Sequence, residues 1–367
     1  DRQTDRQTDR QTDRQTDRNN NISLLNLLMT IAIILYHSKN YYQLNVMEDQ
    51  LSSRMISLFY GFDDMLGGIA LSFFFTISGF LLYSRINCLG DCLMKIKRRF
   101  FSLVIPFTLW NAIWFIYQII YQYVIHRTII DWTILDILIG FSIVPFDGPL
   151  WYIFALLLCL PFLLVFYRCK SKKIVCAILL FVVTVSSFVY HLYVPGNLNN
   201  VFLSWLSRLV TYLPCYAFGA FIALTNHGNI FVSNITTVRI GTKVLSIAGL
   251  TYLTLYANAF PEVSWWVSKA VPVFLLMSMN NQRRSIACNC QVARYTFFYY
   301  AMHQPLIGIL NTVVYHIIGK NSMSIPLAIL SRIVYICVIL AICMGFALLS
   351  KRILPQKLFK ALSGGRV

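Results

Sequence analysis

Length, composition and charge restrict the class of this protein at the outset. The chain has 367 residues, of which 57% are hydrophobic and only 12% are charged, and its mean hydropathy is +0.63. These values exclude an ordinary soluble domain and indicate an integral membrane protein. The formal net charge of +17 does not indicate a nucleic-acid partner, because the chain lacks a water-soluble domain with one basic face.

The chain begins with a repetitive segment. Residues 1–18 repeat Asp-Arg-Gln-Thr four times and then give Asp17-Arg18. The segment is net neutral and holds no apolar residue, so it predicts a disordered tail. The tetranucleotide GACA, read through all three frames as GAC AGA CAG ACA, encodes this repeat. We therefore hypothesise a simple-sequence tract whose length changes switch the reading frame and make expression phase-variable; an inert repeat is the alternative.

Apolar runs recur along the rest of the chain with lengths near the roughly 20 residues that a helix needs to cross the hydrocarbon. They predict an all-α fold with about ten transmembrane helices, at 22–37, 68–84, 100–124, 149–167, 174–193, 205–224, 241–259, 264–279, 295–317 and 325–349. The run at 134–144 is too short to span and contains Asp136, so it predicts an interfacial or re-entrant helix.

The basic residues of the connecting loops predict the orientation. Alternate loops beginning with 85–99 hold nineteen Lys and Arg, whereas the other set holds four. The positive-inside rule therefore places both termini in the cytoplasm. The predicted organisation is a tail at 1–18, one transmembrane domain at 19–354 and a cytoplasmic basic tail at 355–367.

Two histidines are candidates for acid or base chemistry. His37 ends the first apolar run, where a membrane helix meets water, and few other side chains change proton occupancy near neutral pH. Asn26 lies eleven residues earlier, on the same helix face and about 16 Å away. His303 lies inside the ninth predicted span, where an ionisable group is costly and usually faces a cavity or a partner. The alternatives are an interfacial His37 hydrogen-bonded to water and a core His303 that donates one hydrogen bond.

Three cations lie a few residues inside the predicted outer ends of helices six, eight and ten: Arg208, Lys269 and Arg332. Each can extend its charge to the interface, which is the ordinary behaviour of such residues. Their similar depth also supports an outer vestibule that binds an anionic glycan or lipid-phosphate acceptor.

Further positions suit either packing or binding. Ser78 and Gly79 interrupt a bulky helix, so another helix or a ligand can approach the backbone there. Trp151 begins the fourth helix, where an aromatic belt and a stacked sugar are both possible. The long outer loop at 38–67 is a candidate for acceptor selection, and a carboxylate partner for His37 would come from Asp63, Asp64 or Asp147.

No metal site is predicted. Cys288 and Cys290 are separated by one residue in a loop assigned inside. No second pair of ligands accompanies them at known zinc spacings.

Five short segments, in order along the chain, carry a resemblance: 21–37, 71–82, 95–106, 149–154 and 299–305. The chain resembles the acyltransferase 3 family of membrane O-acyltransferases over about residues 21–350. The resemblance implies ten helices with both ends inside, and transfer of an acyl group, most often acetyl from acetyl-CoA, to hydroxyls of sugars in lipopolysaccharide, capsule or similar acceptors.

The resemblance also implies roles for individual residues. His37 would be a general base that takes the proton of the acceptor hydroxyl, or a nucleophile that carries the acyl group, and His303 would orient the acceptor or polarise the carbonyl. Arg98 and Arg99 would bind the phosphates of coenzyme A, although anchoring by the positive-inside rule also explains them. With Ser78 they would line the acetyl-CoA site.

Asn26 departs from the family pattern. The usual residue eleven positions before the histidine is Arg, and an amide hydrogen-bonds but brings no charge. We assign Asn26 to the acetyl-CoA site as well.

The predicted function is a multi-pass inner-membrane O-acetyltransferase that acts on a surface glycan or its lipid-linked precursor. Two alternatives stay open. Ten helices with intramembrane charges also suit a transporter or flippase, although the two halves show no repeat of hydropathy. Asn26 keeps open an inactive relative that acts as a scaffold in glycan assembly.

Overall fold

The computed structural model describes residues 22–41, 50–84, 86, 88–127, 132–169, 173–194, 201–225, 236–256, 259–278, 293, 295–318 and 323–364. The tail at 1–18, Cys288 and Cys290 lie outside these ranges. Within them the secondary structure is helical and contains no strand, as the apolar runs predict.

The helices follow the order of the predicted runs. They are Ile22–His37, α3 (Gln50–Tyr83), α4 (Leu89–Tyr121) with η1 (Gln122–His126), α5 (Ile134–Ser142), η2 (Gly148–Leu150), α6 (Trp151–Cys159), α7 (Phe162–Cys169), α8 (Lys173–Tyr193), α9 (Val201–Thr225), α10 (Thr236–Tyr256), α11 (Pro261–Ser278), α13 (Thr296–Ile318), α14 (Ile325–Ile353) and α15 (Gln356–Leu362).

Six helical segments in the described ranges are long and apolar enough to cross a membrane: Ser53–Tyr83, Leu89–Val124, Gly148–Arg168, Lys173–Tyr193, Leu203–Thr225 and Ile325–Ile353. The helix Ile22–His37 is apolar but shorter. The other predicted spans coincide with α10, α11 and α13. These helices confirm a multi-helix membrane protein, whereas ten spans and cytoplasmic termini stay predictions.

The first long loop was predicted wrongly. Residues 38–67 were expected to connect two spans, but α3 begins at Gln50 and is 34 residues long. Hydropathy falls at the start of this helix while helix-forming side chains continue, so a hydropathy criterion misses its first turns. At 1.5 Å per residue, α3 is about 51 Å long, which exceeds the roughly 30 Å of hydrocarbon.

The predicted short helix at 134–144 is confirmed as α5. Its first turn forms a capping box, in which the Thr133 hydroxyl accepts from the Asp136 backbone N–H at 3.1 Å and the Asp136 carboxylate accepts from the Thr133 backbone N–H at 2.9 Å. Asp136 therefore serves the helix end, which explains a charged residue in an otherwise apolar run.

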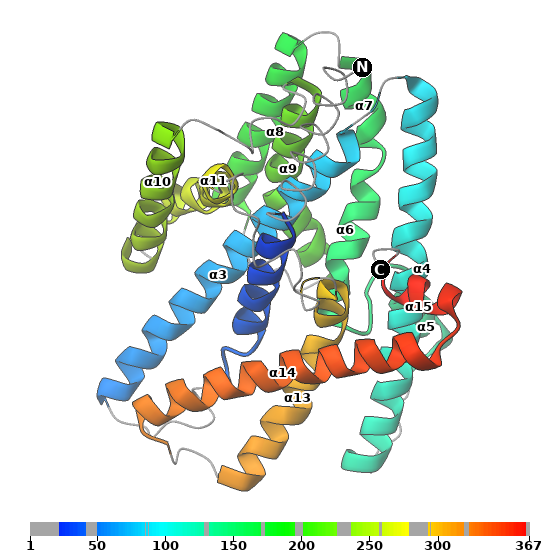
Figure 1. Cartoon of the computed structure of the whole chain (residues 1–367), viewed down its shortest axis with the longest axis vertical. Coiled ribbons are helices and arrows are strands. Elements are labelled where there is room, and N and C mark those ends of the chain that lie inside the picture. Colours follow the sequence, from blue (N-terminus) through cyan, green and yellow to red (C-terminus); the bar gives the residue numbers. More distant parts are fainter. Residues whose placement is uncertain are drawn as a thin grey trace, which may run out of the picture.

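Figure 1 shows how the helices are arranged. α4, α6 and α8 run along the long axis of the molecule, α3 runs obliquely, and α14 crosses the long axis. α3 and α9 pack closely because Gly79 and Gly219 occur where they cross: a Cβ at Gly79 would overlap the Tyr216 carbonyl oxygen, and a Cβ at Gly219 would overlap that of Thr76. The packing interpretation of Gly79 is confirmed.

The last described helix is not a loose tail. In α15, Phe359 and Leu362 are buried, and the Trp110 indole N–H of α4 donates to the Leu362 carbonyl at 3.0 Å. The segment predicted as a basic tail is thus tied to the helical domain.

Candidate functional site

The structure brings together the two histidines that sequence patterns single out separately. His37 ends the first helix and His303 lies two turns into α13, and their ring centroids are 5.0 Å apart with an interplanar angle of 51°. On its other side the His37 ring meets the Tyr36 ring edge-to-face at 4.9 Å. Two imidazole rings therefore lie together at the end of the first helix, where the sequence alone predicted one.

The hydrogen bonds of His303 define its tautomer. The His303 side chain is fully buried, and its Nδ1 lies 2.8 Å from the Tyr300 carbonyl oxygen and 3.1 Å from that of Tyr299. Carbonyl oxygens only accept, so the proton belongs on Nδ1 and the neutral ring has a lone pair on Nε2. Within the described part of the chain, Nε2 has no hydrogen-bond partner. It is available to accept a proton or a hydrogen bond.

Arg332 holds the end of the first helix. Its Nη2 donates to the Leu35 carbonyl at 2.8 Å, the Ser38 hydroxyl at 3.3 Å and the Asp63 carboxylate at 2.7 Å. Both charged side chains of the ion pair are buried. Arg332 was expected to line a vestibule for an anionic acceptor, but its charge is already neutralised by Asp63.

The acidic candidates for a His37 partner are placed elsewhere. Asp63 pairs with Arg332, and Asp64 forms an exposed ion pair with Lys39 at 2.8 Å. Asp147 precedes η2 with 4% of its surface exposed. Burial raises the pKa of the Asp147 carboxyl well above its usual range.

Aromatic side chains cover the space around Ser78. The Tyr152 hydroxyl donates to the Phe74 carbonyl at 3.0 Å and lies 2.9 Å from the Ser78 hydroxyl. Because the phenol has one proton, Ser78 donates to Tyr152. Phe75 meets Tyr152 edge-to-face at 5.1 Å and stacks on Tyr212 at 5.5 Å.

The other two predicted acceptor-binding cations rest on aromatic faces. Arg208 lies over the Trp151 ring at 5.8 Å, and Lys269 lies over Tyr212 at 4.7 Å and over Trp265 at 4.8 Å. Arg208 and Lys269 thus lie against aromatic rings, whereas Arg332 lies at the end of the first helix.

Sequence reasoning missed several side chains of this region. Tyr212 and Phe75 lie in long apolar helices, where an aromatic residue carries no distinguishing signal. Tyr152 follows Trp151 at the start of a predicted span, where aromatic residues are common.

The other predicted acetyl-CoA residues lie on the first helix and on α4. Asn26 is half-buried within the first helix, and its backbone carbonyl accepts from the Thr30 hydroxyl at 2.7 Å. Arg98 is exposed and Arg99 half-buried, both near the start of α4. Lys95, in the same basic segment, donates to the Leu82 carbonyl at 3.3 Å and so caps the end of α3.

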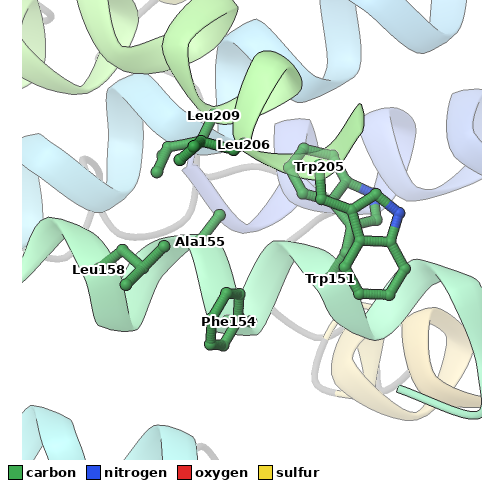
Figure 2. A pocket seen from close by; sticks show the side chains of 7 residues that line it. All are labelled: Trp151, Phe154, Ala155, Leu158, Trp205, Leu206 and Leu209. Atoms are coloured by element: carbon green, nitrogen blue, oxygen red, sulfur yellow. The ribbon is translucent and has the colours of Figure 1, made fainter. Parts of the chain in front are cut away.

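A recess opens between α6 and α9 (Figure 2). Its lining is entirely apolar and consists of Trp151, Phe154, Ala155, Leu158, Trp205, Leu206 and Leu209. Among the described residues, no group of three or more His, Cys, Asp or Glu side chains is placed to hold a metal ion.

A histidine pair, with His303 buried and His37 half-buried, thus lies within a multi-helix membrane protein. The family profile described as an acyltransferase domain, that of the acyltransferase 3 family, matches residues 19–349. The chain belongs to this family, as the five short segments predicted. No curated protein and no solved structure matches it.

Proposed function

We propose that this membrane acyltransferase moves acetyl from cytoplasmic acetyl-CoA to a hydroxyl of a cell-surface glycan or its lipid-linked precursor. The observation that carries the proposal is the pairing of His37 with His303 at 5.0 Å, in a chain of the acyltransferase 3 family. Acyl transfer to a hydroxyl needs a group that removes the hydroxyl proton, and His is the side chain most often used for it.

In the proposed reaction His37 is the general base. It takes the acceptor hydroxyl proton while that oxygen bonds to the thioester carbonyl carbon. The carbon–sulfur bond then breaks, and the departing thiolate receives this proton from His37. The products are an acetyl ester and free coenzyme A, so atoms and charges balance. An acyl-His37 intermediate is a second route to the same products.

The geometry favours one of the two roles considered for His303. Polarising the thioester carbonyl requires an N–H, but Nδ1–H of His303 is directed at the backbone and Nε2 carries a lone pair. His303 is thus suited to accept a hydrogen bond from the acceptor hydroxyl or from His37. We assign it to orientation of the acceptor.

The two substrates would approach from opposite sides. Arg98 and Arg99 follow the first turns of α4 and match the phosphate groups of coenzyme A in charge. Asn26 and Ser78 would lie along the route of the thioester. Trp151, Arg208 and Lys269 provide aromatic faces and positive charge for an anionic glycan. Phase-variable expression through the Asp-Arg-Gln-Thr tract would suit an enzyme that alters a surface structure.

The histidine pair can be tested with purified protein. In lipid nanodiscs, the wild-type chain is incubated with acetyl-labelled acetyl-CoA and surface polysaccharide from cells that carry the gene, after alkaline removal of O-acetyl groups. We expect His37→Ala to lower kcat by about 100-fold or more and His303→Ala to lower it as well.

A matched control is His316→Ala, because His316 lies on the same helix α13 and is exposed. It should retain wild-type activity. No release of coenzyme A from the wild-type protein with any acceptor would contradict the proposal and favour a transporter or a scaffold. Equal activity of His37→Ala and His316→Ala would contradict the assignment of the base.

A further inference from the structure

α14 contacts both helices that carry the histidine pair. Arg332 and Tyr335 are three residues apart on this helix and therefore share one face. Both side chains are buried, with 4% and 5% of their surface exposed. This face of α14 is therefore covered by protein. The first helix ends against it, and α13 passes alongside it.

Arg332 and the Ser38 hydroxyl both donate to a backbone carbonyl at the end of the first helix, that of Leu35. The last four carbonyl groups of a helix have no partner within it, and the Leu35 carbonyl is one of them. Arg332 donates to this oxygen at 2.8 Å and also to the Ser38 hydroxyl at 3.3 Å. These two residues bracket His37 along the chain, so the guanidinium bonds to the backbone before the imidazole and to a side chain after it.

Asp63 holds Arg332 in that position. Its carboxylate accepts from the same Nη2 at 2.7 Å, from the neighbouring helix α3. Removing a buried partner leaves an uncompensated charge, so the guanidinium and the carboxylate depend on each other. The pair ties three helices together at the end of the first.

Tyr335 makes the corresponding contact with α13. Its hydroxyl lies 3.1 Å from the Ile307 carbonyl oxygen and 2.8 Å from the Asn311 side-chain oxygen. Ile307 is one helical turn after His303. The Tyr335 ring also meets the Tyr41 ring at 4.9 Å, just beyond the end of the first helix.

We propose that Arg332, supported by Asp63, and Tyr335 are positioning residues that set the separation and orientation of His37 and His303. The proposal rests on the function proposed above. One face of α14 bonds to a backbone carbonyl within about one helical turn of each histidine, so α14 is the common reference for both rings. A displacement of about 1 Å between reacting groups lowers the rate by about 100-fold.

The test uses four variants of the full chain in nanodiscs: Arg332→Lys, Arg332→Gln, Asp63→Asn and Tyr335→Phe. The kinetics of acetyl-CoA hydrolysis and of acetyl transfer to the de-O-acetylated polysaccharide are measured for each variant. Hydrogen–deuterium exchange of the segment 34–41 is measured as well. Matched controls are Arg352→Lys on α14 and Tyr315→Phe on α13, which change exposed side chains.

We expect kcat to fall by about 10-fold to 100-fold with little change in the KM for acetyl-CoA, because the substrate site is intact but the histidines are displaced. Exchange of 34–41 should rise in the Arg332 and Asp63 variants. Arg332→Lys, which keeps the charge, should retain more activity than Arg332→Gln. The controls should match the wild type.

Wild-type kcat and exchange in folded Arg332→Gln and Tyr335→Phe would overturn the inference, as would a fall in kcat that the exposed controls share. If Arg332→Gln does not fold, Tyr335→Phe decides the question alone, because it removes only a hydroxyl. If the wild-type chain transfers no acetyl group, the proposed function fails, whereas unaltered exchange of 34–41 in the Arg332 and Asp63 variants overturns the positioning role of this ion pair by itself.

Discussion

Asp63 and Arg332 form a buried pair, and Lys39 and Asp64 form an exposed pair one residue further along α3. The two pairs allow a buried contact between a carboxylate and a cation to be compared with an exposed one. Asp63→Ala leaves the guanidinium buried without its carboxylate, and we expect a loss of about 3–5 kcal/mol. Asp64→Ala disrupts a solvated contact, and we expect a loss of about 0–1 kcal/mol. Denaturant or thermal unfolding in detergent measures both.

Replacing both members of the buried pair provides the control. Asp63→Leu combined with Arg332→Met removes the two charges together, so the double variant should be more stable than Asp63→Ala. A double variant that is less stable would show that the remaining bonds of Arg332 to Leu35 and Ser38 outweigh the cost of burying the pair.

Asp147 predicts a pH dependence of stability. Burial raises the pKa of its carboxyl well above the usual value, so the folded chain keeps a proton that the unfolded chain releases. Stability therefore falls as the pH rises from the ordinary Asp range toward the raised pKa. Asp147→Asn removes this penalty. The melting temperature of the variant relative to wild type should increase as the pH rises above the ordinary Asp range.

Asp136 is the control of opposite sign. Its side-chain and backbone hydrogen bonds with Thr133 lower the pKa of its carboxyl, so its contribution is present above the ordinary Asp range and is lost as the pH falls through the lowered value. Asp136→Asn should weaken the cap at neutral pH. A pH-independent difference for Asp147→Asn would show that its carboxyl is ionised in the folded chain.

At the scale of secondary-structure elements, the crossing of α3 and α9 depends on two glycines. Cβ atoms at Gly79 and Gly219 would overlap backbone carbonyl oxygens of the partner helix. Because backbone cannot move aside as a flexible side chain can, we expect Gly79→Ala or Gly219→Ala to cost about 1–3 kcal/mol or more. The thermal stability of purified protein measures the loss.

Gly68 lies on the same helix α3, and a Cβ there would meet no atom within 4 Å. Gly68→Ala should therefore stabilise the helix by about 0.8–1 kcal/mol, the difference in helix propensity. Equal effects of Gly68→Ala and Gly79→Ala would contradict the close approach of the two helices.

Helices occur where hydropathy predicts them, although the run 149–167 is divided between α6 and α7, and helix ends are where prediction fails. α4 begins at Leu89, eleven residues before its apolar run, because Cys88 and Asp91 form a capping box ahead of the basic segment that starts at Lys95. Hydropathy reports which residues suit lipid, whereas helix ends depend on capping groups and on helix-forming polar residues. The same difference explains the early start of α3.

The site was predicted residue by residue but not as an arrangement. His37 and His303 each carried a local signal, namely an ionisable group at or within an apolar run. Their contact depends on the packing of α13 against the first helix, which no local pattern encodes. Arg332 was assigned to acceptor binding because a cation near a helix end usually reaches the interface. Its partner Asp63 sat in a segment read as loop, so the pair was not anticipated.

For the whole molecule, the distribution of basic residues predicts the orientation in the membrane. Cys88 is exposed in a loop predicted inside, and Ser324 precedes α14 in a loop predicted outside. In a background without other cysteines, a membrane-impermeant maleimide added to intact spheroplasts should label Ser324→Cys but not Cys88. Cys88 should react only after permeabilisation. The reverse pattern would place both termini outside.

The bonds between Arg332 and the first helix connect residues that are made at very different times. Leu35 and Arg332 are separated by 297 positions, which at about 5–20 residues per second corresponds to roughly 15–60 s of synthesis. During that interval the first helix and α3 are already made, but Asp63 has no cation and the end of the first helix is not held. Asp63 thus gains its cationic partner only after α14 has been made. A chain terminated before α14 would lack these bonds, so the arrangement of the histidines would be among the last events of its biosynthesis.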